Sequence, residues 1–144
     1  MKIRSFKESD RQAVILLWDQ CNLTTPQNNP SLDIDRKLKV DPDLFLVGIF
    51  NHQVIATVMG GYEGHRGWVN YLAVSPEHQR KGYGQAVMLA VEKLLVSKGC
   101  PKINLQVRAS NKKIMAFYCS IGYGDDSVIG LGKRFEDDSN VKVL

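Results

Sequence analysis

The sequence contains no long apolar run. No stretch approaches the roughly 18 consecutive apolar residues that a membrane-spanning helix needs, and Met1–Phe6 alternates charged and apolar residues, unlike a signal peptide. Internal repeats and low-complexity linkers are also missing. Together with 44% hydrophobic and 24% charged residues, these absences predict a single soluble domain over residues 1–144 that has no membrane partner.

Cysteine is scarce, and no charge sign dominates. The three cysteines, Cys21, Cys100 and Cys119, are odd in number and scattered, and their spacing matches no zinc-binding pattern. We therefore expect no metal site, and free thiols favour the reduced cytoplasm. The net charge is only +4, and two short basic clusters stand near the ends of predicted helices, Arg80-Lys81 and Lys112-Lys113.

These clusters do not form the continuous basic face, interleaved with aromatics, that nucleic-acid binding requires. We therefore expect no nucleic-acid partner. Attraction of a polyphosphate ligand explains both clusters, although Lys112 and Lys113 are equally consistent with solvated residues at a helix end.

One segment combines a strand, a glycine loop and the start of a helix. The apolar stretch Val69–Val74 ends at Ser75-Pro76, and a basic loop with Gly82 and Gly84 leads directly into an apolar helical pattern. A helix N-terminus offers an anion unpaired N–H donors and about half a positive charge. The glycines permit close approach and unusual backbone angles. This order predicts a loop that binds pyrophosphate.

The details of this loop exclude two common phosphate-binding motifs. It has no G-x-x-x-x-G-K-[ST] sequence, and Val87 stands where a dinucleotide fingerprint needs its third glycine. What remains is Q-x-x-G-x-G over Gln79–Gly84, which resembles the acetyl-coenzyme A loop of the GCN5-related N-acetyltransferases, the GNAT superfamily. The hexamer alone is also compatible with a plain glycine-rich turn before a helix.

A second motif, in the expected order and separation, supports this resemblance. Asn111 opens a predicted helix that carries Phe117-Tyr118, and Gly122-Tyr123 ends it, as in the later motif of the family. The resemblance covers nearly the whole chain, while residues 1–40 match only in pattern. It extends to small bacterial members of the YpeA type, and Val107–Asn111 is similar to the RimI ribosomal-protein acetyltransferases.

Periodicity, turn residues and caps predict the element order β-α-α-β-β-β-α-β-α-β. We expect a capping box at Ser9–Gln12, Pro30 as a first helical residue, a bend or bulge at Gly60-Gly61 and a helix-ending Gly99. The predicted strands are Lys2–Phe6, Leu44–Phe50, Val54–Tyr62, Trp68–Val74, Ile103–Val107 and Val128–Phe135. The predicted helices follow Ser9 and Pro30, span Gly82–Lys98 and begin after Ser110 or Asn111, and the acidic tail from Glu136 is expected to fray.

This order describes an α/β fold whose mixed sheet carries helices on both faces. The resemblance implies the GNAT fold, a mostly antiparallel sheet in which strands Trp68–Val74 and Ile103–Val107 run parallel and splay apart at one end. It also implies that acetyl-CoA is bound with its pantetheine arm in that gap. The residues implied to bind this cofactor are Leu72, Ala73, Val74, Gln79, Arg80, Lys81, Gly82, Tyr83, Gly84, Gln85, Asn111 and Tyr118.

The resemblance makes Tyr118 the candidate general acid that protonates the departing thiolate. A phenol with a pKa near 10 stays protonated at pH 7 and still serves a thiol whose pKa is near 8.5. By spacing alone, Tyr118 is also compatible with a core aromatic, and Asn111 with a plain helix cap. Cys119 is not expected to carry the acetyl group, because its helical direction is about 100° from that of Tyr118.

The general base departs from the family pattern. The resemblance implies a carboxylate or histidine on the strand before the glycine loop, where Trp68 and Asn70 stand here, and RimI-like sequences have a glutamate where Gln106 stands. None of the three accepts a proton at neutral pH. Glu63 and His65 are the remaining catalytic candidates nearby, with solvated loop polarity as their alternative role. An amine deprotonated by solvent would need no dedicated base.

The sequence therefore predicts an enzyme, an acetyl-CoA-dependent N-acetyltransferase. Its acceptor is a primary amine of a small molecule or peptide, which attacks directly in a ternary complex. The alternative is a non-catalytic module of the same fold that binds acyl-CoA. The oligomeric state stays open between monomer and homodimer, and acidic Asp33, Asp35 and Glu63 are expected on the acceptor side.

Overall fold

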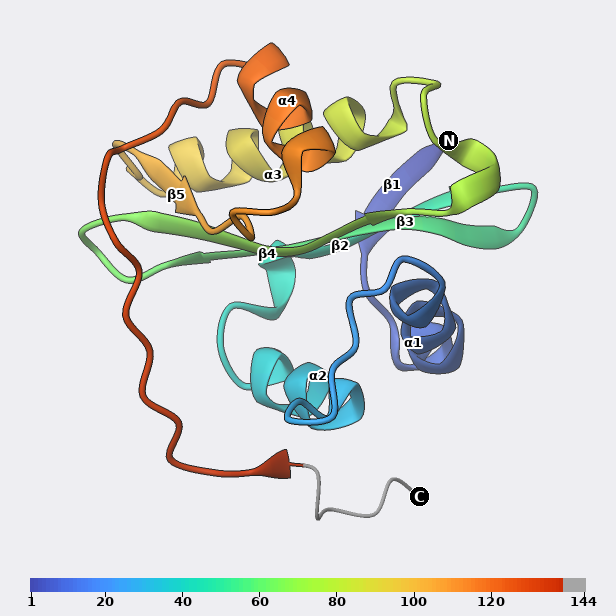
Figure 1. Ribbon diagram of the computed structural model, residues 1–144. Helices are drawn as coiled ribbons and strands as arrows, with labels where there is room; N and C mark the ends of the chain where they lie inside the picture. Colours follow the sequence, from blue (N-terminus) through green and yellow to red (C-terminus); the bar gives the residue numbers. More distant parts are fainter. Residues whose placement is uncertain (139–144) are drawn as a thin grey trace.

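The chain forms one open five-stranded sheet (Figure 1), seen in a computed structural model that describes residues 1–138. The strands follow one another in chain order across the sheet, and every neighbouring pair is antiparallel except the last pair, which is parallel. The strands are β1 (Lys2–Ser5), β2 (Phe45–Phe50), β3 (Gln53–Tyr62), β4 (Gly67–Val74) and β5 (Ile103–Leu105). The predicted mixed, mostly antiparallel sheet is confirmed.

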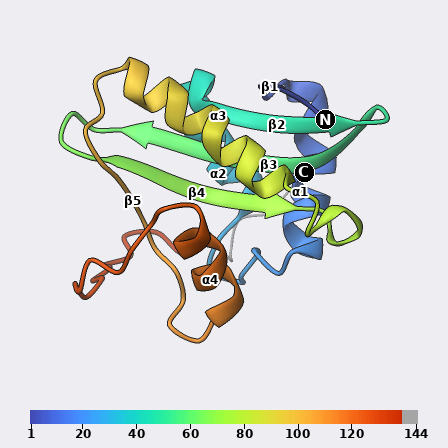
Figure 2. The same cartoon turned by 90° about the horizontal axis from the view of Figure 1, so that it is seen from above.

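Among residues 1–138, four α-helices cover the two faces of this sheet: α1 (Arg11–Gln20), α2 (Pro30–Leu38), α3 (Tyr83–Ser97) and α4 (Lys112–Ser120). In Figure 1, α1 and α2 lie below the sheet and α3 and α4 lie above it. Seen from above, α3 runs over the antiparallel strands while α4 lies beyond β4 (Figure 2). None of the helices within the described residues is both long and apolar enough to span a bilayer.

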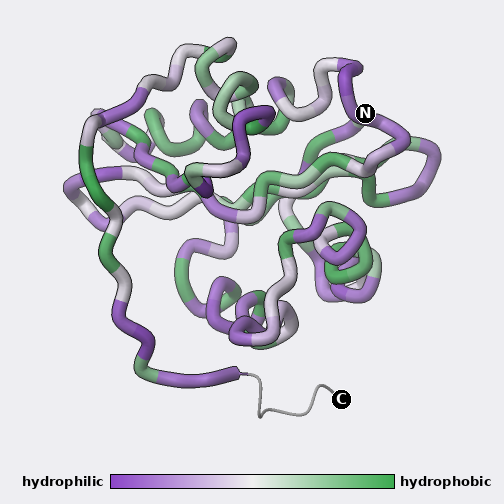
Figure 3. The backbone as a smooth tube through the Cα atoms, viewed as in Figure 1, coloured by the Kyte–Doolittle hydropathy of each residue, from purple (hydrophilic) through white to green (hydrophobic). Residues whose placement is uncertain are grey.

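Each face of the sheet has its own hydrophobic core, because neighbouring residues of a strand point to opposite faces. Leu46 and Val58 pack toward α3, whereas Phe45 and Val47 pack toward α1 and α2. Apolar residues accordingly run along the strands and recur along the helices (Figure 3). Trp18 of α1 is fully buried in the lower core and stacks near Phe45, with 6.1 Å between ring centroids.

Several local predictions are confirmed. Asn51 and His52, both with positive φ (49° and 64°), form the two-residue turn that joins β2 to β3. Pro30 occupies the first position of α2, and the Asn29 side chain caps this helix. Gly99 follows α3 in the left-handed conformation at φ 88° and ends the helix as expected.

One local prediction is wrong, and another is wrong in one of its two alternatives. Ser9 does not cap α1; instead the Asp10 carboxylate accepts the backbone N–H of Lys7 at 2.8 Å and is held by Arg4 at 2.7 Å. Of the bend or bulge expected at Gly60-Gly61, the bulge is absent, because these residues pair in register with Val69 and Trp68; the extra residue of this strand pair lies in β4. Gly60 is required for close packing, since a Cβ on it would lie 2.6 Å from Val91 of α3.

The predicted last strand, Val128–Phe135, is also wrong, and β5 ends at Leu105 instead of Val107. Four apolar side chains of this segment, Val128, Ile129, Leu131 and Phe135, are 77–91% exposed. The alternating pattern favours extended backbone, but a strand also requires a partner edge. Among the described residues, the segment instead forms an irregular crossing that we call the C-terminal strap, residues 126–138.

The strap is fastened at both ends. Lys102 pairs with Asp126 at 2.8 Å, and Arg134 donates to the backbone carbonyl of Gln27 at 3.1 Å. Arg36 of α2 holds the Asp138 carboxylate with two hydrogen bonds of 2.8 and 3.0 Å. The acidic tail is therefore anchored as far as Asp138, which is only 4% exposed. The rest of the tail that was expected to fray, residues 139–144, lies outside the described residues.

Replacement of Gly60 tests the close approach of β3 and α3. Gly60→Ala should lower the free energy of unfolding by about 1–3 kcal/mol, because the buried, branched Val91 side chain must move. Gly124→Ala is the matched control, since its Cβ would meet nothing within 4 Å. Urea denaturation of both variants measures the difference, and an unchanged midpoint for Gly60→Ala would contradict the packing seen here.

Candidate functional site

The two parallel strands separate on the way to the glycine loop. Pairing between β4 and β5 covers only Gly67–Val69 opposite Ile103–Leu105, while β4 continues for five more residues to Val74. Beyond Leu105 the neighbouring chain leaves the sheet and leads to α4. The second half of β4 therefore has an unpaired edge, as the splayed sheet predicted from the sequence requires.

A β-bulge interrupts β4 at the start of this open edge. Thr57 of β3 pairs with Ala73 and Met59 pairs with Asn70, so two residues of β4, Tyr71 and Leu72, oppose one residue of β3. Tyr71 has a positive φ of 52°, which is unusual for a residue with a bulky side chain.

The bulge changes which side chains share a face. Tyr71 and Ala73 belong to the lower core with α1 and α2, whereas Leu72 and Val74 pack with the upper core under α3 and α4. A bulge re-aims the backbone as well as the side chains, and such features are common beside active sites. The backbone of Leu72 thus lies at the point where β4 and β5 have parted.

A buried hydrogen-bond network holds the bulge. The indole N–H of Trp18 donates to the hydroxyl of Thr57 at 2.8 Å, and this hydroxyl donates to the Tyr71 carbonyl at 2.9 Å. The Trp18 and Tyr71 rings stack with 3.8 Å between centroids. The Tyr71 hydroxyl donates to Asp33 at 2.6 Å, and burial together with this carboxylate raises the pKa of Tyr71. Sequence reasoning missed the network, because only a single threonine within an apolar strand marks it.

The glycine loop follows β4 and wraps the N-terminus of α3. The side-chain amide of Gln79 donates to the Val74 carbonyl at 3.0 Å, which ties the loop to the end of the strand. Arg80 and Gly82 have positive φ values of 62° and 84°. No side chain caps α3 at Gly82, and Arg80 and Lys81 are exposed. The first N–H groups of α3 are therefore free of side-chain partners and lie beside two cations.

Two residues of the glycine loop, Gly84 and Tyr83, also make packing contacts within the fold. Gly84 lets α4 approach α3, because a Cβ on Gly84 would lie 3.2 Å from the ring of Phe117. Tyr83 packs its ring in a tilted contact with His78, 6.3 Å between centroids. Gln85 is exposed on the first turn of α3. The carbonyl of Val74 already accepts from Gln79 and from the Cys21 thiol, so a ligand would have to share it.

Helix α4 places Tyr118 in the upper core, against which Leu72 and Val74 of the open edge also pack. Asn111 caps α4 by accepting the N–H of Ile114 at 3.1 Å, which confirms it as the cap. Tyr118 is only 8% exposed and meets Phe117 and Tyr123 edge-on at 5.3 and 5.7 Å. Burial raises the pKa of Tyr118 to about 12, and no hydrogen bond contributes to this shift.

A cavity of about 1680 Å³ lies around the end of β5. Its lining includes Tyr118 from α4, Trp68 and Asn70 from β4, and Asp33 from α2, so one hollow joins the α4 side to the α2 side. Residues 128–131 of the strap line it as well. The three positions that lack the expected base, Trp68, Asn70 and Gln106, all face this cavity.

Glu63 and His65 lie elsewhere. Both are exposed in the turn between β3 and β4, where Glu63 accepts the N–H of Arg66 at 2.9 Å. Five residues of β4 separate this turn from Leu72, a distance of roughly 15 Å or more at the usual rise per residue. The structure therefore does not bring Glu63 and His65 together with Tyr118. Within residues 1–138, no group of three His, Cys, Asp or Glu side chains could hold a metal ion.

Comparison with known proteins defines the class. The sequence profile of the acetyltransferase (GNAT) family matches residues 11–123. The chain is 46% identical over 138 residues to acetyltransferase ECA0875 of Pectobacterium atrosepticum, which covers 96% of this chain and 98% of that protein. Both matches point to an acetyltransferase. The chain belongs to the GNAT family, as its glycine loop and later motif predict.

Solved structures agree on the fold. Ard1 of Thermoplasma volcanium is similar with a TM-score of 0.74 and 23% identity over 84% of this chain and 80% of that one. AAC(6')-Iy, in complex with a bisubstrate analogue, CoA-S-monomethyl-acetylneamine, is similar with a TM-score of 0.76 and 16% identity. That match covers 92% of this chain and 97% of the other.

Removal of one hydroxyl tests the network under the bulge. Thr57→Val should lower the free energy of unfolding by about 1–3 kcal/mol, because the buried Trp18 N–H and Tyr71 carbonyl both lose a partner. A double-mutant cycle with Trp18→Phe, followed by urea denaturation, should give a non-zero coupling energy. Thr24→Val, which removes only an exposed bond to Asp19, is the control and should change stability by less than about 0.5 kcal/mol. Strictly additive effects of Thr57→Val and Trp18→Phe would contradict the network.

Proposed function

We propose that this chain is an acetyl-CoA-dependent N-acetyltransferase that transfers the acetyl group to a primary amine by direct attack in a ternary complex. The carrying observation is that three features border the same upper core: Leu72 and Tyr83 pack against the cluster that contains Tyr118, and Gly84 lies against Phe117 of α4. The three features are the uncapped N-terminus of α3, the bulge at Leu72 and the buried Tyr118.

The glycine loop fits a diphosphate. Its α3 N–H groups have no side-chain cap, and the helix end carries a partial positive charge. A Cβ on Gly82 would meet nothing within 4 Å, so the loop is open on its outer side. Arg80 and Lys81 add attraction there. The residues therefore suit the diphosphate of coenzyme A, whose thioester supplies the acetyl group.

The bulge suits the charge that develops on a thioester carbonyl. Backbone N–H groups aimed at such an oxygen are each worth about 3 kcal/mol in the transition state. Leu72 is the candidate donor, because it lies in the bulge on the unpaired part of β4. Thr57 and Trp18 would keep this donor in place through the carbonyl and ring of Tyr71.

Tyr118 suits the role of general acid. With its pKa raised to about 12 by burial, its hydroxyl stays protonated at every working pH. It lines the cavity and has a proton to donate to a departing thiolate, whose own pKa is near 8.5. Asn111 occupies its cap, so any contact with the pantetheine arm would use its remaining amide N–H groups.

Loss of the amine proton needs no fixed base in this scheme. Glu63 and His65 remain the candidates from the sequence, yet their position in the β3–β4 turn argues for action at most through water. Solvent that enters the cavity would accept the proton. The missing base at Trp68, Asn70 and Gln106 also favours one alternative, a non-catalytic module of the same fold that binds acyl-CoA.

The first test concerns binding. Coenzyme A at 100 times its dissociation constant should stabilise the folded chain by about 2.7 kcal/mol, seen as a raised melting temperature. Arg80→Ala combined with Lys81→Ala should weaken binding about tenfold in calorimetry, as expected for two exposed charges. Lys39→Ala, an exposed lysine at the end of α2, is the control. A chain whose melting temperature ignores both coenzyme A and acetyl-CoA would rule out the proposal and its alternative.

The second test concerns chemistry. Tyr118→Phe should lower turnover tenfold or more, with little change in coenzyme A affinity, because it removes only the proton donor. Thiol release with a panel of amines measures turnover. Tyr62→Phe is the control, since its hydroxyl contacts the Gly64 and Gly99 carbonyls outside the cavity. Unchanged turnover in Tyr118→Phe would assign Tyr118 to the core, and tight binding without turnover on any amine would favour the non-catalytic module.

A further inference from the structure

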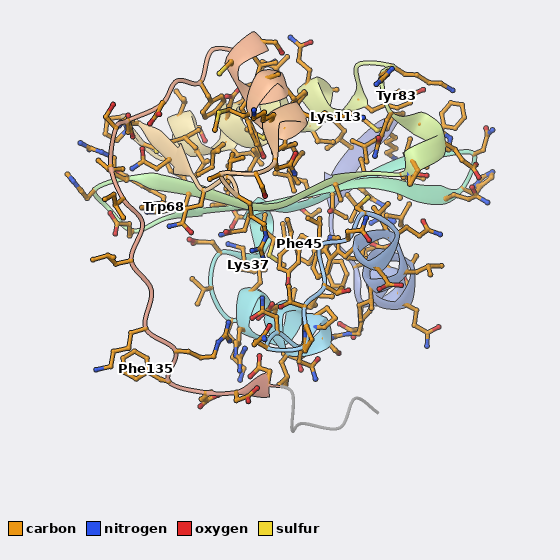
Figure 4. The ribbon with its side chains drawn as sticks, in the orientation of Figure 1. Lys37, Phe45, Trp68, Tyr83, Lys113 and Phe135 are labelled. Carbon is orange, nitrogen blue, oxygen red and sulfur yellow. The ribbon has the colours of Figure 1, made fainter. Side chains whose placement is uncertain are left out.

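The ammonium group of Lys37 lies beneath the sheet and forms no ion pair with a carboxylate among the described residues. Lys37 extends from α2 toward the strands (Figure 4), where its Nζ donates to the Gly60 carbonyl and would lie 3.7 Å from a Cβ on Gly61. None of the ion pairs within residues 1–138 includes Lys37. Asp41 and Asp43 act on it only from beyond ion-pair distance, and burial lowers its pKa.

The neighbouring Arg36 shows the contrast. Its guanidinium pairs with Asp33, Glu136 and Asp138, so its charge is used to anchor the strap. Lys37 has no such structural partner, yet it lines the same cavity as Trp68 and Tyr118. A half-buried ammonium in a cavity is the complement of an anionic group on a ligand.

Lys37 lies over Gly61, and the two residues that pair across the sheet from Gly61 carry side chains on the same face. Gly61 pairs with Trp68, and Trp68 pairs with Asn104 of β5, so these three residues lie side by side. They share the α2 face, because Val69 and Ile103 beside them pack toward α3. Trp68 is 39% exposed, and the buried side-chain oxygen of Asn104 has no hydrogen-bond partner. Lys37 and this row together thus offer a cation, the exposed ring of Trp68 and the unsatisfied side-chain oxygen of Asn104.

A polar path leads from this row to the bulge. Asn70 follows Trp68 on the same face of β4, and Gln106 follows Asn104, and both line the cavity. Three residues lie between Trp68 and Leu72, so the two are about 13 Å apart along the strand. An acceptor whose amine reaches the bulge would therefore place its far end at Lys37.

The strap limits what fits along this path. It crosses the cavity near Gln106, because a Cβ on Gly130 would lie 3.0 Å from the Gln106 amide nitrogen. Its ends are fixed by Asp126 and Asp138. A ligand between strap and sheet is therefore enclosed on two sides, which favours a short acceptor over the continuing chain of a folded protein.

We propose that the acceptor carries a carboxylate, bound by Lys37, about 10 Å from its reacting amine, which is the strand distance of about 13 Å less the approach of about 3 Å between amine and thioester. This inference rests on the proposed function. Because an extended chain spans about 3.3–3.6 Å per residue, the separation matches a peptide of two or three residues with a free C-terminus. Its amide N–H groups would meet the free oxygen of Asn104, and its side chains would lie on Trp68.

The first experiment uses the intact chain and one pair of probes. Trialanine with a free carboxylate should be acetylated with a kcat/KM at least tenfold higher than trialanine C-terminal amide, and the difference should lie mainly in KM. The two probes share the amine, the length and the side chains, so only the interaction with the terminal charge differs. Equal kcat/KM values for the two would overturn the proposal, whatever the variants show.

The second experiment assigns the charge. Lys37→Met keeps the half-buried stem but should raise KM for the free peptide at least tenfold while leaving the amide within twofold. Lys39→Met, exposed on the same helix end, should leave the preference intact. A Lys37→Met variant that is well folded and still prefers the free carboxylate would overturn the role of Lys37.

Failure of the proposed carboxylate site can be distinguished from failure of the proposed function. If coenzyme A binds but no amine is acetylated, the proposed function fails, and calorimetry with the same two peptides then decides the inference. Preferential binding of free trialanine in the presence of coenzyme A would support the site, and equal affinity for acid and amide would refute it.

Discussion

The geometry of the candidate site depends on one contact, the hydrogen bond from the Thr57 hydroxyl to the Tyr71 carbonyl. A bulge in a strand leaves one residue unpaired, and its backbone groups then need partners outside the ladder. Thr57 supplies one such partner and is itself held by the Trp18 indole N–H. Through this chain of contacts, the packing of α1 determines how β4 turns at Leu72.

The two faces of the sheet have different proposed roles, one in binding the acetyl donor and the other in binding the acceptor. The upper face carries the glycine loop, α3 and α4, whose close approach requires Gly84, and this face suits the thioester carrier. The lower face carries α2 and the strap, with Lys37 and the Arg36–Asp138 pair. The bulge lies between them, because it sends Tyr71 down and Leu72 up. Donor and acceptor would thus meet from opposite sides of one strand.

Short-range features were predictable from sequence because they depend on residues close together in the chain. The Asn51-His52 turn, the Asn111 cap and the Gly99 helix end all form as local chemistry requires. The strap was predicted wrongly for the opposite reason. Its alternating apolar residues favour extended backbone, but whether an extended segment becomes a strand depends on a free neighbouring edge.

The amino-acid sequence by itself determined the family, the glycine loop and the order of nearly all the elements, since these follow from local spacing and from hydrophobic periodicity. Only the tertiary structure decided which polar groups meet. Trp18 and Thr57 are 39 residues apart, and Arg36 and Asp138 are 102 residues apart. No local pattern encodes such pairs, because packing of the helices on the sheet brings them together.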